Sequence, residues 1–508
     1  MKKRLPGAPA LIALILLFFP ALLFARERSE PISLTILHVN DVHGHVLPYS
    51  EPSVNEKTRV SGAARLAAMI GAERAANPDG SLLLSAGDMF QGTAISNEFR
   101  GQSVIEIMNA LKFDAMAIGN HEFDWGLDTL AQLVSSARFP SLSANIFDSR
   151  GESIHGIKPY VLLTRKNLKI AVIGATTVDT VTSTEPSNVA GLIFPDPATI
   201  LPEIIKKVRE EGAKLVILLS HLGLAADRHL AEQVEGIDVI VGGHSHTVLD
   251  DPLLVRGTII VQAGYYGLYL GVLELAVDPS SGKIVRFTDK DELKPVISGL
   301  DLPLDANIAQ IVDKYDGLIK EKFAAVTGEA SVELTRQPYQ ESVLGDLITD
   351  AMREATHTQI AFHNSGGIRD NIPPGKITLE TIYAVLPFDN VLAGMDLTGE
   401  QLMEILEQNG ALEKKILQVS GIEVEYDMSK PPGSRVAKAL VGSEPLDRQK
   451  VYSVTTNDFV AAGGDKFATF TKGKNITWGD NLRDVFSAYL KKHSPITPRS
   501  LNRIKFLN

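Results

Sequence analysis

Histidine, aspartate and asparagine side chains follow five short apolar runs in the N-terminal half of the chain. These runs read ISLTILHVND, SLLLSAGD, FDAMAIGNH, KLVILLSH and IDVIVGGHSH. Each run predicts a buried strand followed by a loop, and the carboxyl ends of strands in an α/β sheet meet at one crevice. Seven side chains that can bind a metal fall at those ends: Asp41, His43, Asp88, Asn120, His221, His244 and His246. Imidazole, carboxylate and amide groups suit zinc, manganese or iron far better than calcium.

No single segment predicts a metal site by itself. His221 could be a core-edge histidine, and the two glycines before His244 could form a turn with solvated histidines. The whole set is improbable as an accident, because five separate strand ends carry donors in sequence order. Seven donors exceed the needs of one ion. We therefore expect two divalent ions (Zn, Mn, Co or Mg) that share one carboxylate.

Two neighbouring metal ions are typical of in-line displacement at phosphorus. Ions about 3.5–4 Å apart hold a hydroxide, lower its pKa and neutralise charge on the phosphoryl oxygens. His121 and Asp124 stand beside the donors but are not needed as ligands. Asp124 is close enough in sequence to orient the ring of His121, as in the histidine–carboxylate pairs of general acid–base catalysis.

Composition excludes several other chemistries. The chain of 508 residues is 44% hydrophobic and has no cysteine, which excludes disulfides, iron–sulfur clusters, thiolate zinc sites and cysteine nucleophiles. The formal net charge of −11 argues against a broad basic surface for a nucleic-acid polymer. A two-metal nuclease acting on such a polymer is therefore disfavoured.

The first 25 residues are typical of a secretory signal. Three basic residues precede an apolar run from Ala8 to Ala25, which Pro9 and Pro20 interrupt. This pattern predicts cleavage near Ala25, and an uncleaved membrane anchor is the alternative. We expect an exported protein, in the periplasm or outside the cell, that has no stable membrane anchor after cleavage.

The remaining chain divides into two domains and a linker. Strand patterns alternate with helical patterns over residues 26–303, which indicates an α/β domain. Residues 304–328 carry apolar side chains at helical spacing and predict a long bridging helix. The pattern restarts over residues 329–508. Two domains joined by a helix also predict a hinge motion between them.

Two capping boxes locate helix starts in these domains. Ser103 with Glu106 is expected to open one helix, and Thr398 with Gln401 is expected to open another. Gly410 is expected to close the second of these helices.

The motifs as a set resemble the 5′-nucleotidase family of dimetal calcineurin-like phosphatases, which includes UDP-sugar hydrolases and 2′,3′-cyclic phosphodiesterases. They occur in the order ILHVNDVHGH, GDMFQG, GNHEFDWG, SHLG, GGHSHT, HNSGGIRD, LPFDN and TNDFVAAGGD, over nearly the whole mature chain. The resemblance implies an N-terminal four-layer α/β/β/α metallophosphatase sandwich. It also implies a C-terminal α+β nucleoside-binding domain, joined to the first domain by the long helix.

The resemblance implies a role for each donor. One metal would be held by Asp41, His43, Asp88 and His246. The other metal would be held by Asp88, Asn120, His221 and His244. Asp88 would then bridge the two ions. His121 would stabilise the transition state or protonate the leaving oxygen, with Asp124 as its partner.

In the second domain the resemblance implies a nucleoside pocket. Phe388 in LPFDN and Phe459 in TNDF match the two aromatic rings that sandwich the base, although the pattern alone favours core packing for both. Aromatic stacking contributes about 1–3 kcal/mol per base. The polar ligands would be Asp465 for the ribose, Asn364 and Asn390 for base or sugar, and Arg369 for phosphate.

One segment departs from the family pattern. Family members usually carry an arginine seven or eight residues before the glycine that corresponds to Gly345. In this chain Arg336 stands about two residues before that position, and Pro338 occupies the position itself. Either Arg336 reaches the phosphate through a shifted loop, or that contact is missing. Loss of a charge-assisted contact would weaken selection for 5′-monophosphates.

The expected function is hydrolysis of nucleoside 5′-monophosphates by a metal-bound hydroxide, with UDP-sugars as a second candidate substrate. A 2′,3′-cyclic-nucleotide phosphodiesterase with 3′-nucleotidase activity is the nearest alternative. A relative that cleaves sulfate from a sulfur carrier fits the GNHEFD motif less well. The non-enzyme alternative is a secreted nucleotide-binding module with a decayed metal site, which the intact donor set disfavours. The oligomeric state is unknown, because it has no signature in the sequence.

Overall fold

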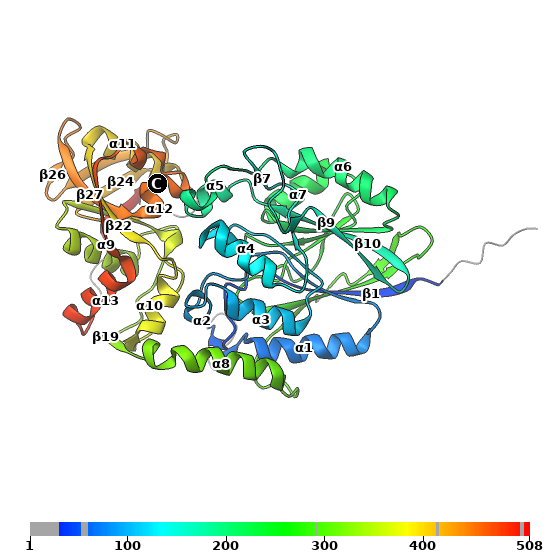
Figure 1. The fold of residues 1–508 in the computed structure, drawn as a ribbon. Helices are drawn as coiled ribbons and strands as arrows, with labels where there is room; N and C mark the ends of the chain where they lie inside the picture. Colours follow the sequence, from blue (N-terminus) through cyan, green and yellow to red (C-terminus); the bar gives the residue numbers. More distant parts are fainter. Residues whose placement is uncertain (1–29, 52–58, 291, 413–415, 498–501, 508) are drawn as a thin grey trace, which may run out of the picture.

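The computed structural model describes residues 30–51, 59–290, 292–412, 416–497 and 502–507. The predicted secretory signal over residues 1–25 lies outside the described residues. Figure 1 shows two lobes side by side, with helix α8 (Ala306–Phe323) along one edge. We call the described residues before α8 the N-terminal lobe and those after it the C-terminal lobe. None of the described helices is long and apolar enough to cross a membrane.

The N-terminal lobe is built on two β-sheets. In spatial order, the first sheet contains β17 (Ile284–Phe287), β16 (Tyr269–Val277), β1 (Ile32–Val39), β4 (Ser81–Ser85), β5 (Ala115–Ala117), β6 (Ser141–Leu142) and β8 (Ile157–Lys158), with β18 (Leu293–Pro295) beside β16. The second sheet contains β14 (Leu253–Val255), β15 (Thr258–Val261), β13 (Val239–Gly242), β12 (Leu215–His221), β10 (Leu168–Thr176) and β9 (Tyr160–Arg165). Strands β1, β4 and β5 run parallel in the first sheet, as do β10, β12 and β13 in the second.

The two sheets bury apolar side chains against each other. Leu34, Ile36 and Leu82 of the first sheet lie in one core with Val172 and Ile217 of the second, and all five are fully buried. Near-continuous apolar strands of this kind are expected for parallel sheets that are covered on both faces.

Helices cover the outer faces of both sheets (Figure 1). The first sheet is covered by α1 (Ala63–Ala76), α3 (Gln102–Leu111) and α4 (Gly126–Ser136). The second sheet is covered by α6 (Pro197–Glu210) and α7 (Leu224–Gln233). The predicted four-layer α/β/β/α sandwich is therefore confirmed.

Helix α8 is fastened to the N-terminal lobe. The Asp305 side chain caps it by accepting a hydrogen bond from the Ile308 N–H at 2.9 Å. Its buried face packs against α1 and α3. Tyr315 Oη and Lys314 Nζ both donate to Glu106 Oε2 of α3, each at 2.7 Å. The predicted bridging helix is therefore present, and it lies against the first lobe instead of spanning open space.

The capping box predicted at Ser103 with Glu106 is wrong. Helix α3 begins at Gln102, and its N-cap is Gly101, two residues before the predicted N-cap Ser103, with a left-handed φ of 81°. Ser103 lies inside the helix, where its Oγ donates to the Ile95 carbonyl at 2.9 Å. The Glu106 carboxylate instead binds α8, so a contact with a distant helix replaces the local cap.

The C-terminal lobe is also a mixture of sheets and helices. Its larger sheet contains β23 (Leu417–Ser420), β20 (Ile360–Asn364), β27 (Val451–Asn457), β22 (Val391–Thr398) and β28 (Lys474–Asn481). A second sheet contains β26 (Glu444–Pro445), β25 (Val436–Val441), β24 (Ile422–Asp427) and β29 (Ile504–Leu507). The longer helices are α9 (Val343–Thr356), α11 (Gly399–Ala411) and α13 (Leu482–His493). This arrangement confirms the predicted α+β character.

The capping box predicted at Thr398 with Gln401 is confirmed, because both of its reciprocal hydrogen bonds are present. The helix that it opens, α11, continues through Gly410 and ends at Ala411, one residue beyond the predicted stop. Local helix signals therefore located the start of this element and narrowly missed its end.

Short elements complete both lobes. At their junction lie α2 (Ala94–Asn97), α5 (Thr180–Ser183), α10 (Leu379–Val385) and α12 (Asp458–Ala461). Short strand pairs are β2 (Tyr49–Ser50) with β3 (Arg59–Val60), β7 (Phe147–Asp148) with β11 (Leu192–Ile193), and β19 (Val326–Ala330) with β21 (Gly375–Thr378). Figure 1 shows α5 of the first lobe facing α12 of the second.

Candidate active site

The carboxyl ends of β1, β4, β5, β12 and β13, together with the loops that follow them, bring the seven predicted donors together. Six of them form two clusters, within each of which the candidate ligand atoms lie within 4.8 Å of one another. One cluster contains Asp41, His43 and His246, and the other contains Asp88, His221 and His244. Because β1, β4 and β5 belong to one sheet and β12 and β13 to the other, the crevice lies where the carboxyl edges of two sheets meet.

The first cluster has the donor set of a cation site. His43 Nε2 lies 3.2 Å from His246 Nε2, and His246 Nε2 lies 3.4 Å from Asp41 Oδ1. Two ring nitrogens and a buried carboxylate oxygen thus converge on one point. A divalent cation of the zinc or manganese type fits this set of ligands.

The second cluster is joined to the first by Asp88. Asp88 Oδ2 lies 3.1 Å from His221 Nε2 and 3.8 Å from His43 Nε2, so it stands between the two clusters. Asn120 Oδ1 lies 3.2 Å from His221 Nε2 and 3.0 Å from His244 Nδ1. The seventh donor therefore belongs with the second cluster.

Backbone strain and hydrogen bonds hold these side chains in position. Five of the donors have left-handed φ values between 49° and 71°: Asp41, His43, Asp88, His244 and His246. Such conformations are costly for residues other than glycine and gather at functional sites. His43 Nδ1 donates to the Gln91 carbonyl at 2.8 Å and His221 Nδ1 to the Ala86 carbonyl at 2.7 Å, which leaves each Nε2 available as a ligand.

Three residues that sequence reasoning missed support the donors. Glu122 accepts the backbone N–H groups of Asp88 at 2.9 Å, Met89 at 2.8 Å and Gly119 at 2.7 Å. It therefore ties the loop after β4 to the loop after β5. Burial and the neighbouring Asp88 raise the pKa of Glu122 to about 7. Its presence in the GNHEFD motif was the available signal.

The other two missed residues are Asn40 and Gln262. Asn40 Nδ2 donates to Asp41 Oδ2 at 2.7 Å. Gln262 Oε1 accepts the Thr247 N–H at 2.6 Å, and Gln262 Nε2 donates to the Gly243 carbonyl at 2.9 Å. Gln262 thus braces the loop that carries His244 and His246. Asn40 stands in the ILHVNDVHGH motif, which was the available signal, whereas Gln262 lies outside the quoted motifs.

His121 and Asp124 form the predicted pair. His121 Nδ1 lies 2.7 Å from Asp124 Oδ2, and Asp124 Oδ1 accepts a hydrogen bond from Thr184 Oγ1 at 2.7 Å. Burial lowers the pKa of His121, but the Asp124 and Asp88 carboxylates outweigh burial and raise it. The centroid of the His121 ring lies 5.1 Å from that of His43 and 5.6 Å from that of Phe388. His121 is therefore located between the clusters and the C-terminal lobe.

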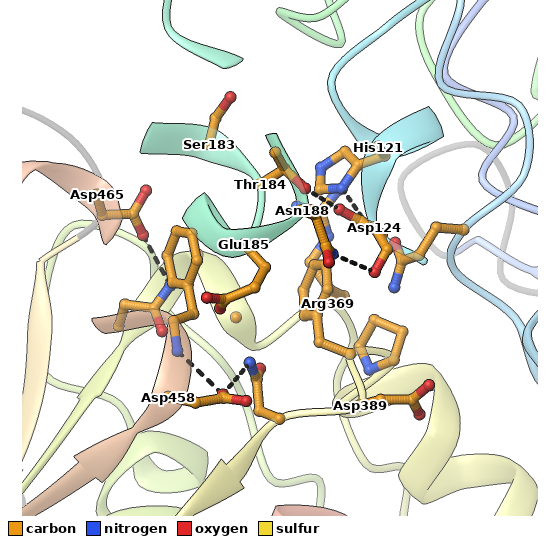
Figure 2. A pocket seen from close by; sticks show the side chains of 18 of the residues that line it. His121, Asp124, Ser183, Thr184, Glu185, Asn188, Arg369, Asp389, Asp458 and Asp465 are labelled. Carbon is orange, nitrogen blue, oxygen red and sulfur yellow. Dashed lines mark hydrogen bonds and ion pairs between the residues drawn. The ribbon is translucent and has the colours of Figure 1, made fainter. Parts of the chain in front are cut away.

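A cavity lies between the lobes beside His121. All six predicted substrate residues line it: Asn364, Arg369, Phe388, Asn390, Phe459 and Asp465. Figure 2 shows His121, Asp124 and Arg369 on one side of this space and Asp465 and Asp458 on another. The structure therefore brings together every residue that the sequence assigned to substrate.

The C-terminal lobe contributes one cation and a network of amides to the cavity. The charges of Tyr266, Asp88 and Asp124 outweigh burial and raise the pKa of the Arg369 guanidinium. Asn364 Nδ2 donates to Asp465 Oδ2 at 2.7 Å. Arg369 is therefore a fixed positive charge that faces the metal clusters.

The Phe459 ring rests on a glycine. A Cβ atom at Gly464 would lie 2.5 Å from that ring, so only glycine fits beneath it. Asn390 Nδ2 donates to Asp458 Oδ1 at 2.7 Å on the same wall. The aromatic ring is thus held at the cavity surface by the TNDF and GGD motifs together.

Arg336 has a different contact from the one expected of a phosphate ligand. Its Nη1 donates to the Ile368 carbonyl at 3.1 Å, and its backbone N–H donates to Asn371 Oδ1 at 2.9 Å. Among the described residues that line the cavity, Arg369 is included and Arg336 is not. Arg336 therefore supports the loop that carries Arg369.

The fold and the paired clusters define a calcineurin-like phosphoesterase that uses two divalent metal ions. Residues 34–248 match the family model for calcineurin-like phosphoesterase, and residues 323–472 match that for the 5′-nucleotidase C-terminal domain. The chain is 34% identical to a bovine (Bos taurus) 5′-nucleotidase, in an alignment covering 99% of this chain and 95% of the relative. The chain therefore belongs to the 5′-nucleotidase family.

Solved structures agree with this assignment. A 5′-nucleotidase precursor from Thermus thermophilus superimposes with a TM-score of 0.87 at 34% identity, covering 94% of this chain and all of that one (100%). The sulfate thiohydrolase SoxB from the same organism has a TM-score of 0.79 at 22% identity, covering 93% of this chain and 96% of that one. The second likeness shows that the two proteins share a fold.

Proposed function

We propose that the protein hydrolyses nucleoside 5′-monophosphates to nucleosides and phosphate, with UDP-sugars as a second candidate substrate. The observation that carries this proposal is the shared cavity. His121, which lies next to His43 of the first cluster, lines it on one side, and Phe459 and Asp465 line it on the other. A nucleotide has the same polarity, since its phosphate lies at one end and its base at the other.

Two metal ions would be held as the resemblance implies. The proposed ligands of one are Asp41, His43, Asp88 and His246. The proposed ligands of the other are Asp88, Asn120, His221 and His244. When bound, such ions lower the pKa of water and neutralise charge on the phosphoryl oxygens.

The remaining roles fall to side chains of this chain. His121 would protonate the leaving 5′ oxygen from Nε2, because Asp124 holds its Nδ1 at 2.7 Å. Arg369 would bind the phosphate, a task suited to a guanidinium. Phe388 and Phe459 would enclose the base, which allows different bases to bind.

Ribose would be bound by Asp465. Its carboxylate can accept hydrogen bonds from the ribose hydroxyls, while Asn364 Nδ2 donates to Asp465 Oδ2 at 2.7 Å and orients it. Asn390 would contact the base or the sugar.

We also propose the domain limits 26–303, 304–328 and 329–508. The signal over residues 1–25 would direct the enzyme to the periplasm or the cell exterior. Support comes from the basic n-region and the apolar run before Ala25. N-terminal sequencing of the exported protein tests the cleavage site.

A phosphate-release screen tests the activity. The mature protein is assayed with nucleoside mono-, di- and 2′,3′-cyclic phosphates and UDP-sugars, in Mn, Zn, Co or Mg, against a chelator blank. Highest turnover of 5′-monophosphates, lost with chelator, is expected. Highest turnover of cyclic nucleotides would favour the phosphodiesterase alternative. Metal-independent nucleotide binding without phosphate release would identify a binding module.

A further inference from the structure

One of the carboxylates that line the cavity and have no role in the function proposed above is Glu185. Glu185 lies just after α5, at the start of the 3-10 turn Pro186–Val189, and it belongs to the N-terminal lobe. It lines the same cavity as Phe388 and Phe459. Figure 2 shows it projecting into the space between Arg369 and Asp458.

Only one of the two oxygens of the Glu185 carboxylate accepts a hydrogen bond from the described residues. Its Oε1 accepts a hydrogen bond from Ser187 Oγ at 3.3 Å. Its Oε2 is buried and has no hydrogen-bond partner among the residues that the structure describes. Buried carboxylate oxygens normally have a partner, so the donor for this one must come from what occupies the cavity, either water or a bound ligand.

The opposite wall carries a second carboxylate. Burial and then the charge of Asp458 raise the pKa of Glu185. Asp458 already accepts from Asn390 Nδ2 at 2.7 Å and from the Phe459 N–H at 3.0 Å. Of Glu185 and Asp458, Glu185 is therefore the residue with a buried carboxylate oxygen that accepts no hydrogen bond from the described residues.

We propose that Glu185 selects the base, because its free Oε2 accepts a hydrogen bond from the exocyclic amino group of adenine or cytosine. This inference rests on the proposed nucleotidase function and names its preferred substrates. An ionised carboxylate accepts hydrogen bonds and cannot donate them. A base with a carbonyl at the same position, such as uracil, turns an oxygen toward Glu185 and is disfavoured.

The test compares substrates that differ at that group. CMP is compared with UMP, and AMP with purine riboside 5′-monophosphate, which has a hydrogen where AMP has its amino group. Wild type, Glu185→Gln and Glu185→Ala are assayed with metals bound. p-Nitrophenyl phosphate serves as the substrate without a base. Glu203→Gln, an exposed glutamate on α6 of the same lobe, is the matched control.

We expect wild type to prefer the amino base by about tenfold in kcat/KM, the effect of one hydrogen bond to a charged group. In Glu185→Ala the ratio of kcat/KM for the amino base to that for its partner should fall close to one through a change in KM. The kcat for nucleotides and the turnover of p-nitrophenyl phosphate should not change. Glu185→Gln should lower the CMP-to-UMP ratio of kcat/KM, because an amide can also donate to a carbonyl.

Two outcomes would count against the inference in different ways. If wild type and Glu185→Ala hydrolyse nucleotides with the same ratio of kcat/KM between amino and non-amino bases, the role of Glu185 alone would be overturned. A wild-type enzyme that releases phosphate from p-nitrophenyl phosphate and from no nucleotide would overturn the proposed function, and the inference with it.

Discussion

At the residue scale, the candidate metal centre depends on the two oxygens of Asp88. Its Oδ1 accepts the His121 N–H at 2.9 Å, which leaves Oδ2 between His221 at 3.1 Å and His43 at 3.8 Å. The backbone at Asp88 is left-handed, with φ of 52°. A loop held in this conformation points one carboxylate at both clusters, as a shared ligand requires.

Asp88→Asn should therefore remove most of the metal bound at the candidate centre and most of the catalytic activity. An asparagine keeps the size of the side chain but removes the charge and one of the two acceptor oxygens. We expect loss of most bound metal and a fall in kcat of at least about 100-fold, since even outer partners of metal ligands contribute 10–100-fold. Metal analysis and phosphate release measure both. The exposed Asp128→Asn is the control, and normal turnover by Asp88→Asn would rule out a bridging role.

Glu122 offers a second residue-scale prediction, this time for a group that positions the loops. Glu122→Gln leaves one acceptor oxygen for three backbone N–H groups and sets an amide donor against one of them. We expect metal affinity to fall about 10–100-fold and the free energy of unfolding to fall by about 1–3 kcal/mol. Chelator competition and urea denaturation separate the two effects. A stability loss with wild-type metal affinity would reduce Glu122 to a purely structural role.

Residue types at strand ends were sufficient to predict the seven donors and the His121–Asp124 pair as candidates. The structure brings all nine together. Glu122 and Gln262 escaped prediction because they act on backbone groups of other loops, and so does Asn40, whose Oδ1 accepts the Ala263 N–H at 2.8 Å. Glu122, for example, binds the N–H of Asp88, 34 residues away in the chain. Spacing patterns within one segment carry no information about such contacts.

At the scale of elements, periodicity predicted which segments would be helices better than it predicted their ends and neighbours. The helical spacing over residues 304–328 was recognised, and five residues of α8 are buried: Ile308, Val312, Tyr315, Ile319 and Phe323. Leu318 of the same helix is 67% exposed. The Ser103–Glu106 box failed because Glu106 gains two hydrogen bonds from α8. Local propensity yields to tertiary contacts of this kind.

The contact between α3 and α8 can be tested by a double-mutant cycle. Tyr315→Phe removes one hydrogen bond to Glu106 while keeping the buried ring, and Glu106→Gln removes the charge. We expect Tyr315→Phe to lower the free energy of unfolding by about 1 kcal/mol, with a smaller effect when Glu106 is already glutamine. Urea denaturation measures the four proteins. Strictly additive losses would show that the two side chains do not interact.

At the scale of the whole molecule, the proposed catalytic groups come from the N-terminal lobe, whereas the proposed substrate contacts come from both lobes. The N-terminal lobe supplies the metal clusters, His121 and Glu185, and the C-terminal lobe supplies Arg369 and the aromatic rings. The net charge of −11 is compatible with an anionic substrate, because Arg369 concentrates positive charge locally. Sequence patterns predicted both lobes. They could not predict how the lobes face each other, since that depends on contacts such as Asn97 Nδ2 with the Pro387 carbonyl at 2.6 Å.

The predicted hinge motion between the lobes can be tested at a contact on the rim of their junction. Lys466 Nζ of the C-terminal lobe lies 3.5 Å from Asp179 Oδ1 of the N-terminal lobe, and both side chains are more than half exposed. Because the chain has no cysteine, Asp179→Cys with Lys466→Cys creates a unique pair for a short, cleavable thiol cross-linker. Such a cross-link holds the lobes together over the cavity.

If substrate entry or product release requires the lobes to separate, the cross-linked enzyme should lose at least about tenfold in turnover. Cleaving the cross-linker should restore the activity. The two single-cysteine variants, treated with the same reagent, report any effect of modification alone. Phosphate release before and after cleavage is the measurement. Full activity in the cross-linked form would show that the cavity exchanges its contents while the lobes remain together, and the hinge would then play no part in turnover.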